Sequence, residues 1–249
     1  MLFFKRILKE PETHVVVRKE RRGLSRLPIH ADFPLKAALG FDRCGGTVAP
    51  MGQPGGPEWK GRLRDCSEFG ARIVLGPSAL ASRGDSCELR LSLDGFTLAV
   101  PTQVTNLRVE SDGVHFGLRH EFKDDVVPAA YRQFLGIVAF GATLKPARKA
   151  RPDDPGYRVE QYAGQGSRLT IWRKKDDDVS AFEFLLEDCL VRGAQGHRVE
   201  FLTGADAATA RPATPPKAAE IQRLFNWVVP TLALAVPADA RNFLRRYAA

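Results

Sequence analysis

Hydrophobic and polar residues alternate along much of the first half of the chain, and a period of two is typical of half-buried β-strands. The alternation begins between residues 29 and 35, where Pro34 suits a strand with one free edge. Later runs of the same kind predict strands at residues 59–63, 72–75, 87–93, 96–106 and 114–122. Between two of these runs, Asp94-Gly95 is a strong hairpin signal. Six or so short antiparallel strands with no helical spacing between them predict a small closed β-barrel.

The hydrophobic period changes after the predicted barrel. Between residues 128 and 144 the apolar positions recur at helical spacing, at Tyr131, Phe134, Leu135 and Val138. We therefore expect a helix that packs on the open end of the barrel. Residues 145–156 are charged and rich in proline, a composition typical of a linker.

A second β-unit follows this linker. Its alternating runs predict strands at residues 157–162, 168–173, 179–186 and 198–202, with turns at 164–166, 176–178 and 193–196. Residues 205–216 form a second loose segment by composition. Apolar residues between 221 and 229 then predict an amphipathic helix that ends at Pro230. A last helix is expected from Asp239, acting as its N-cap, to Tyr247.

The predicted fold class is mainly β, with a six-stranded antiparallel β-barrel and a helix after it. A small α+β domain follows, made of an antiparallel sheet and two C-terminal helices. The predicted domains are an N-terminal arm (1–17), the barrel domain (18–144), a linker (145–156) and a C-terminal domain without an assigned role (157–249). A chain of 249 residues is long enough for two such domains.

Positive charge is concentrated at the start of the chain. The whole chain carries a formal charge of +8, and residues 1–30 hold eight Lys and Arg against three Glu, a net of +5. A concentrated basic segment indicates an anionic partner such as a nucleotide, a nucleic acid or a lipid headgroup. Residues 1–9 could form a short amphipathic helix that contacts a membrane surface, although a frayed or docked terminus is the simpler interpretation.

The cysteines and the apolar segments indicate a cytoplasmic protein. The four cysteines form no CxxC pair and lack histidines at metal-ligand spacing, so we expect reduced thiols and no metal site. Lys5 and Arg6 interrupt the apolar N-terminus, so no signal-peptide core is expected there. No apolar run reaches the roughly eighteen residues of a membrane-spanning helix.

Residue patterns that carry catalysis are not found. The chain has no GxSxG, no P-loop and no HExxH, and its five histidines are scattered. The acidic run Asp176-Asp177-Asp178 reads as a solvated hairpin tip rather than a metal site. We therefore expect a binding module rather than an enzyme, without a cofactor.

Two short motifs stand out in this background. Arg22 and Arg26 lie four residues apart before the first predicted strand, and guanidinium groups can grip phosphate bidentately and stack on a flat base. About forty residues later, Asp65, Ser67 and Gly70 combine an acceptor, a hydroxyl and a residue free to take positive φ.

The order and spacing of these motifs resemble the PilZ family, a receptor domain for the bacterial messenger cyclic di-GMP. Its RxxxR motif is matched by Arg22 and Arg26, and its (D/N)xSxxG motif by Asp65, Ser67 and Gly70. The resemblance covers residues 18–125 and implies the barrel that the hydrophobic period predicts independently. No family resemblance is found for the C-terminal half.

The resemblance implies a messenger site and a switch. Its residues would be Arg21, Arg22, Arg26, Asp65, Ser67 and Gly70, with cyclic di-GMP as the ligand. In similar domains, an arginine at the position of Arg21 accompanies the binding of a stacked pair of messenger molecules. The arginine segment would fold onto the barrel when the ligand supplies counter-charge, and residues 157–249 would pass the signal to a protein partner.

Two other interpretations remain open from the sequence. A nucleic-acid-binding arm would explain the basic N-terminus, but it lacks interleaved aromatic residues and a helix with a basic face. A PilZ-like scaffold that has lost its ligand would need no intact motif, whereas here both motifs are complete.

Overall fold

The computed structural model describes residues 26–41, 43–44, 47–48, 58–94, 96–123, 125–147, 154–204, 206 and 208–248. The chain divides after Leu135 into two compact units. We call them the barrel unit, up to Leu135, and the C-terminal unit, from Gly136. The predicted N-terminal arm (1–17), including the candidate membrane-contacting residues 1–9, lies outside the described residues.

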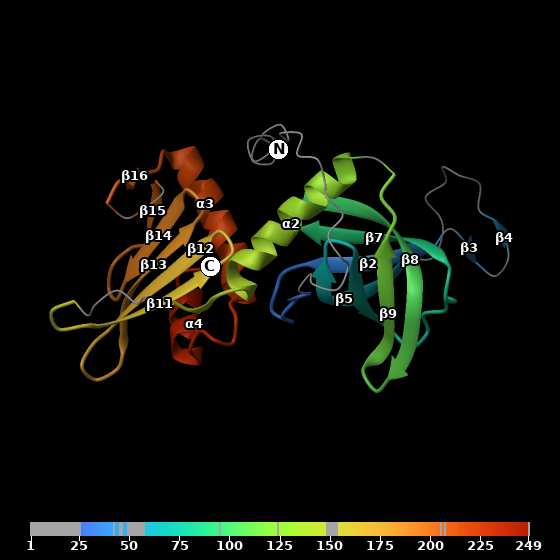
Figure 1. Ribbon diagram of the computed structural model, residues 1–249, viewed down its shortest axis with the longest axis horizontal. Helices are drawn as coiled ribbons and strands as arrows, with labels where there is room; N and C mark the ends of the chain where they lie inside the picture. The colour runs from blue at the N-terminus through green and yellow to red at the C-terminus, as the bar shows by residue number, and fades with distance from the viewer. Residues whose placement is uncertain are drawn as a thin grey trace. The chain divides into compact units, whose positions relative to one another are not determined.

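The barrel unit is a closed antiparallel β-barrel, as predicted (Figure 1). Its strands are β2 (Lys36–Phe41), β5 (Glu58–Ser67), β6 (Gly70–Leu75), β7 (Ser86–Leu93), β8 (Phe96–Glu110) and β9 (Gly113–His120). They follow the order β5-β2-β7-β8-β9-β6, and β6 pairs again with β5, so the sheet closes with six strands. The short β1 (Leu27–Pro28) adds to β5, while β3 (Arg43–Cys44) and β4 (Thr47–Val48) form a separate ribbon.

Alternating side chains fill the barrel. Along β7, every second residue from Cys87 to Leu93 is buried, which is the expected pattern of a strand with one face in a core. Helix α2 (Val126–Ala142) follows the barrel, as predicted, and buries Tyr131 and Phe134. The Phe134 ring lies 6.5 Å from the ring of Phe33. The first part of α2 is therefore packed against the barrel core.

The strand predicted between residues 29 and 35 is wrong. Ile29 and Phe33 are buried, but the backbone turns between them, with the Phe33 amide donating to the His30 carbonyl at 3.1 Å. The barrel strand begins only at Lys36. In β2 three consecutive residues, Ala37 to Leu39, are buried, so no alternation marks this strand. Buried residues in a turn and in a strand give similar patterns, and the fold decides between them.

The C-terminal unit is an antiparallel meander with helices on one face (Figure 1). Strands β10 to β16 follow in sequence order: Lys145–Pro146, Arg158–Gly164, Ser167–Arg173, Val179–Leu186, Cys189–Ala194, Glu200–Thr203 and Arg211–Pro212. Helices α3 (Pro215–Val228) and α4 (Ala238–Arg245) supply apolar side chains to the sheet. Phe225 of α3 stacks on Phe182 of β13 at 5.7 Å, which confirms the predicted pairing of a sheet with two C-terminal helices.

Three segments of this unit differ from the prediction. Strand β14 was not predicted, and Gly193, assigned to a turn, belongs to it. A Cβ at Gly193 would lie 2.4 Å from the Phe182 ring. Lys145 and Pro146, assigned to the linker, pair with β11. Arg211 and Pro212, assigned to a loose segment, pair with β15. These short edge strands have no hydrophobic period, so only their sheet partners reveal them.

Asp239 is not the N-cap that the sequence suggests. Pro237 holds that position, and Asp239 lies in the first turn of α4. Its carboxylate accepts hydrogen bonds from the buried guanidinium of Arg173, which also donates to Glu160 at 3.0 Å. The ion pair with Asp239 raises the pKa of Arg173. Asp239 therefore joins α4 to the sheet instead of capping the helix.

No helix among the described residues is long and apolar enough to cross a membrane.

Candidate ligand site on the barrel wall

Strand β1 brings the arginine motif to the aspartate motif. Leu27 pairs with Cys66 and Pro28 pairs with Asp65, so the residue before β1 is Arg26, beside Asp65. Its Nη1 donates to Asp65 Oδ1 at 2.7 Å. The structure thus joins one predicted site residue from each motif. Arg21 and Arg22 lie outside the described residues, and their role stays a prediction.

A second arginine, which belongs to neither sequence motif, holds the other oxygen of Asp65. Arg72 lies opposite Asp65 on β6, and its Nε and Nη2 contact Asp65 Oδ2 at 2.8 and 2.6 Å. The Asp65 side chain is 10% exposed, whereas the side chains of Arg26 and Arg72 are about half exposed, at 52% and 51%. The family resemblance implies that Asp65 meets a guanine edge or the arginine segment. Here both of its oxygens bind arginines, so it orients two cations toward solvent.

A β-bulge puts this carboxylate on the outer wall. Leu63 pairs with Ile73, but the next pair is Asp65 with Arg72, so one extra residue interrupts the alternation. Cys66 consequently points into the core and is fully buried. Burial raises the pKa of its thiol to about 12, so this thiol stays protonated at pH 7.

Ser67 and Gly70 close the hairpin between β5 and β6. The Ser67 hydroxyl donates to the Gly70 carbonyl at 3.1 Å across the turn that exposes Phe69. Gly70 is free to take positive φ as a glycine, but here it has ordinary strand geometry. A Cβ at this position would lie 2.2 Å from the Leu118 carbonyl oxygen. Glycine is needed here because β9 approaches closely, not because of backbone conformation.

The hairpin turn rests on a buried histidine. The His120 amide donates to the Phe69 carbonyl at 2.9 Å, and its ring contacts Tyr131 of α2 edge-on with centroids 4.5 Å apart. Both ring nitrogens and the Tyr131 hydroxyl lack a hydrogen-bond partner among the described residues. Burial lowers the pKa of His120 to about 4, so the ring is neutral at pH 7. The turn that carries Ser67 and Gly70 is therefore packed, through His120, on α2.

With this geometry in place, the comparison with known families gives one clear result. The family model described as the PilZ domain matches residues 46–135. This part of the chain is a PilZ domain. The match includes Asp65, Ser67, Gly70 and Arg72, whereas Arg26 lies before it. In this PilZ domain the pairing of β1 with β5 joins Arg26 to the matched region.

A solved structure described as "PilZ domain with c-di-GMP of YcgR from Escherichia coli" is similar to part of the chain. The two share 12% sequence identity, and the similarity covers 46% of this chain and 88% of that one, with a TM-score of 0.34. This is too low a likeness for any conclusion about the site, which rests on the contacts described above. No curated protein matches the sequence of this chain significantly.

Three metal-ligand side chains converge at the β8–β9 hairpin of the PilZ domain. Asp112 and Glu110 carboxylate oxygens lie 2.6 and 3.5 Å from His115 Nε2. Asp112 also accepts a hydrogen bond from Arg64 at 2.7 Å, and its contact with His115 lowers the pKa of its carboxyl. The arginine and the histidine account for this acidic pair without a metal ion.

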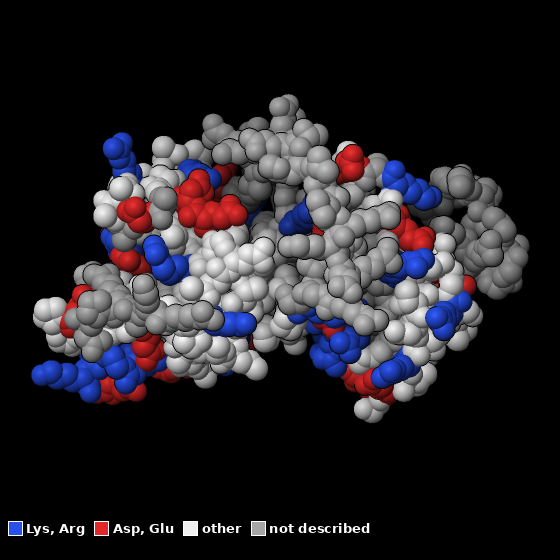
Figure 2. All heavy atoms as spheres, viewed as in Figure 1, with Lys and Arg blue, Asp and Glu red and all other residues white. Residues whose placement is uncertain are grey.

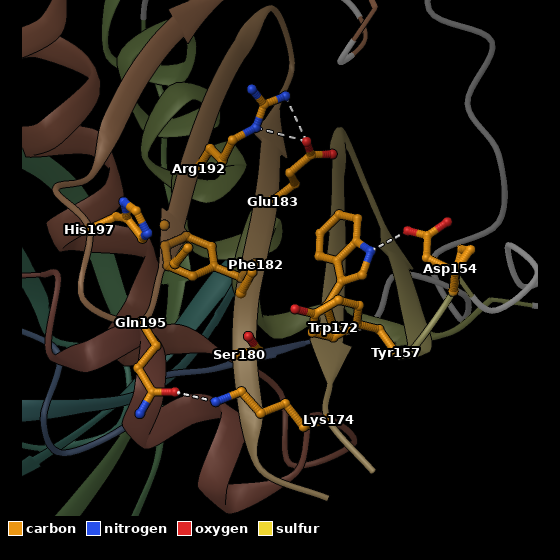
Figure 3. A pocket seen from close by; sticks show the side chains of 14 residues that line it. Asp154, Tyr157, Trp172, Lys174, Ser180, Phe182, Glu183, Arg192, Gln195 and His197 are labelled. Carbon is orange, nitrogen blue, oxygen red and sulfur yellow. Dashed lines mark hydrogen bonds and ion pairs between the residues drawn. The ribbon is translucent and has the colours of Figure 1, made fainter.

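The C-terminal unit has a hollow of its own, on the sheet face away from the helices (Figure 3). Its volume is about 590 Å³, and Trp172 lies near its centre. The polar groups around it bind one another. Arg192 contacts Glu183 at 2.7 Å, Trp172 Nε1 donates to Asp154 at 2.5 Å, and Lys174 donates to Gln195 at 3.1 Å. These three pairs balance charge around the hollow, beside the aromatic ring of Trp172.

Proposed function

We propose that the barrel unit is a receptor for cyclic di-GMP that binds at the outer wall near the β5–β6 hairpin. The proposed site residues are Arg21, Arg22, Arg26, Asp65, Ser67 and Gly70, with Arg72 added. The observation that carries the proposal is the clamp in which the Asp65 carboxylate holds the guanidinium groups of Arg26 and Arg72 at the surface of a PilZ domain.

The clamp suits an anionic, planar ligand. Arg26 uses only Nη1 for Asp65, and Arg72 uses Nε and Nη2, so each guanidinium keeps N–H groups without a partner among the described residues. These donors can bind phosphate oxygens, and the guanidinium planes can stack on guanine. The nearly buried carboxylate fixes the orientation of both cations before a ligand arrives, which lowers the entropic cost of binding.

The test is a calorimetric titration of the full chain with cyclic di-GMP, beside GMP and a DNA oligonucleotide. We expect micromolar or tighter binding of cyclic di-GMP and much weaker binding of the other two. Tighter binding of the oligonucleotide would favour the nucleic-acid alternative. Failure of all three to bind would favour a PilZ scaffold that contacts only proteins.

The charge distribution on the described part of the chain gives a nucleic-acid-binding N-terminal arm little basic surface to extend onto. On the face that Figure 2 shows, basic side chains are interspersed with acidic ones. Arg90 illustrates the pattern, with Glu58 and Glu88 both at 2.7 Å. Duplex binding depends on many phosphate contacts from unpaired cations. A local clamp such as Arg26–Asp65–Arg72 is better suited to a small ligand.

The receptor would pass its signal on through the C-terminal unit. In this proposal the segment that precedes Arg26, from Arg18 onward, becomes ordered around the messenger, while Asp65 already holds Arg26. Residues 157–249 then change their contact with a protein partner. Helix α2 supports a link of this kind, because one continuous helix starts in the barrel unit and ends in the C-terminal unit. Tyr131, which contacts His120 beneath the site, belongs to that helix.

A further inference from the structure

The outer wall next to the proposed site carries a third exposed arginine. Strands β5, β6, β9 and β8 lie side by side, and their pairing sets two rows of residues across this wall. The first row is Ser67, Gly70, Arg119 and Gln103, and the second is Asp65, Arg72, Gly117 and Asn106. Arg119 therefore lies in the row of Ser67 and Gly70, one strand further from the Asp65 clamp.

The guanidinium of Arg119 uses only part of its hydrogen-bonding capacity within the described part of the chain. Its Nη2 donates to Gln103 Oε1 at 2.7 Å and to Glu121 Oε1 at 3.0 Å. Its Nε and Nη1 have no partner among the described residues, and the side chain is 57% exposed. Two acceptors thus fix the group by one nitrogen and take both of its hydrogens. Nε–H and the two Nη1–H groups remain, and Arg119 presents two parallel donors to a ligand once Gln103 or the half-exposed Glu121 gives up its hydrogen bond.

Two glycines lie between Arg72 and Arg119 on the outer wall. Gly70 separates Ser67 from Arg119 in the first row, and Gly117 separates Arg72 from Asn106 in the second. A side chain at Gly70 would collide with backbone, and one at Gly117 would have to displace the Asn106 side chain. A Cβ on Gly70 would meet the Leu118 carbonyl oxygen at 2.2 Å, and one on Gly117 would meet Asn106 Oδ1 at 2.5 Å. The two arginines are thus diagonal neighbours with glycines at the other two corners. Gly70 is buried and Gly117 lies under the Asn106 amide, so no side chain of β6 or β9 separates the two guanidinium groups.

We infer that Arg119 is a specificity-determining residue that binds the O6/N7 edge of one guanine of the messenger. This inference rests on the proposed function, since it concerns the same ligand. A guanidinium fork donates two parallel hydrogen bonds to guanine O6 and N7, whereas adenine offers a donor in place of O6. Neighbouring strands are about 4.8 Å apart, so β9, which carries Arg119, lies two strand spacings from β5, which carries Asp65. Arg119 is placed to contact the far side of a dinucleotide.

The experiment compares cyclic di-GMP with cyclic di-AMP on the full chain. We expect wild type to prefer the guanine ligand, and Arg119→Ala to bind it about tenfold or more weakly while its weak binding of cyclic di-AMP stays the same. Arg119→Lys should behave like Arg119→Ala, because it keeps the charge and loses the fork. Arg90→Ala is the matched control, since Arg90 is also a half-exposed arginine paired with two acceptors on the barrel wall.

The possible results distinguish the role of Arg119 from the proposed receptor function on which that role depends. Failure of wild type to bind cyclic di-GMP would overturn the proposed function. Normal binding by wild type with unchanged affinity in Arg119→Ala would overturn only the role of Arg119. Equal weakening for both dinucleotides would show a charge effect without base recognition and would also overturn it. Thermal unfolding of each variant checks that the barrel stays folded.

Discussion

At the scale of single residues, Asp65 is the centre of the candidate site. Its side chain is almost fully buried, yet both oxygens accept charge-assisted hydrogen bonds from surface arginines. Such bonds are roughly twice as strong as neutral ones. In the proposed receptor Asp65 would contribute to binding indirectly, because it sets where Arg26 and Arg72 point.

Removing either arginine of the clamp should weaken messenger binding. Arg26→Ala and Arg72→Ala each remove a charged donor, a loss of about 1.5–3 kcal/mol, or more than tenfold in affinity. Calorimetry measures this directly, with Arg90→Ala as the control for loss of a surface charge. Wild-type affinity in both variants would rule out the clamp as the ligand site.

Gly70→Val should damage folding as well as binding. The added side chain would collide with the Leu118 carbonyl oxygen, and overpacking of this kind typically costs about 1–3 kcal/mol. The sequence alone suggests that binding would suffer more than folding. Chemical denaturation decides the matter, with Gly76→Ala as the matched control, because nothing lies within 4 Å of a Cβ there. Equal stability of Gly70→Val and wild type would contradict the close approach of β9.

At the scale of elements, the contact of the β5–β6 turn with α2 depends on a neutral histidine. His120 lies between the turn and Tyr131, and burial lowers its pKa to about 4. An unfolded histidine has a pKa of about 6.5, so the unfolded chain binds the proton more tightly. The stability that His120 contributes is therefore complete above pH 6.5 and falls as the pH is lowered toward 4.

This pH dependence is testable by substitution. Between pH 7 and pH 4.5 the barrel should lose up to about 3 kcal/mol of stability through His120. His120→Phe, which keeps a ring against Tyr131 and cannot bind a proton, should lose distinctly less over the same range. Denaturation at several pH values measures the difference, with the exposed His197→Gln as the control. The same slope in His120→Phe and wild type would show that another group is responsible.

At the scale of the whole molecule, the question is whether ligand binding changes the C-terminal unit. Each unit has its own sheet. Helix α2 belongs to both units, since it begins in the barrel unit and ends in the C-terminal unit. A ligand can shift such a system only if it binds one conformation better than another. The clamp, the turn and His120 provide a continuous set of contacts from the ligand site to Tyr131.

Hydrogen exchange should reveal this change. We expect cyclic di-GMP to slow amide exchange in the β5–β6 hairpin and also to alter exchange along α2. Arg26→Ala, measured at the same messenger concentration, should show neither effect. Protection confined to the hairpin would mean that the receptor binds without switching, and the binding proposal would stand without its output.

The sequence by itself determined most of the elements and the spacing of one motif. Period-two runs located β5 to β9, and helical periods located α2 and α3. This is possible because the burial of one face of a strand or helix gives a periodic pattern of apolar residues along the chain. The spacing of Asp65, Ser67 and Gly70 along the chain was also evident from the sequence. The sequence did not show that Arg72 binds the same Asp65 carboxylate as Arg26, or that β9 approaches Gly70 closely. It also did not show that Arg119 lies in the row of Ser67 and Gly70. Those facts depend on a bulge and on the register of strands distant in sequence, and only the closed barrel decides them.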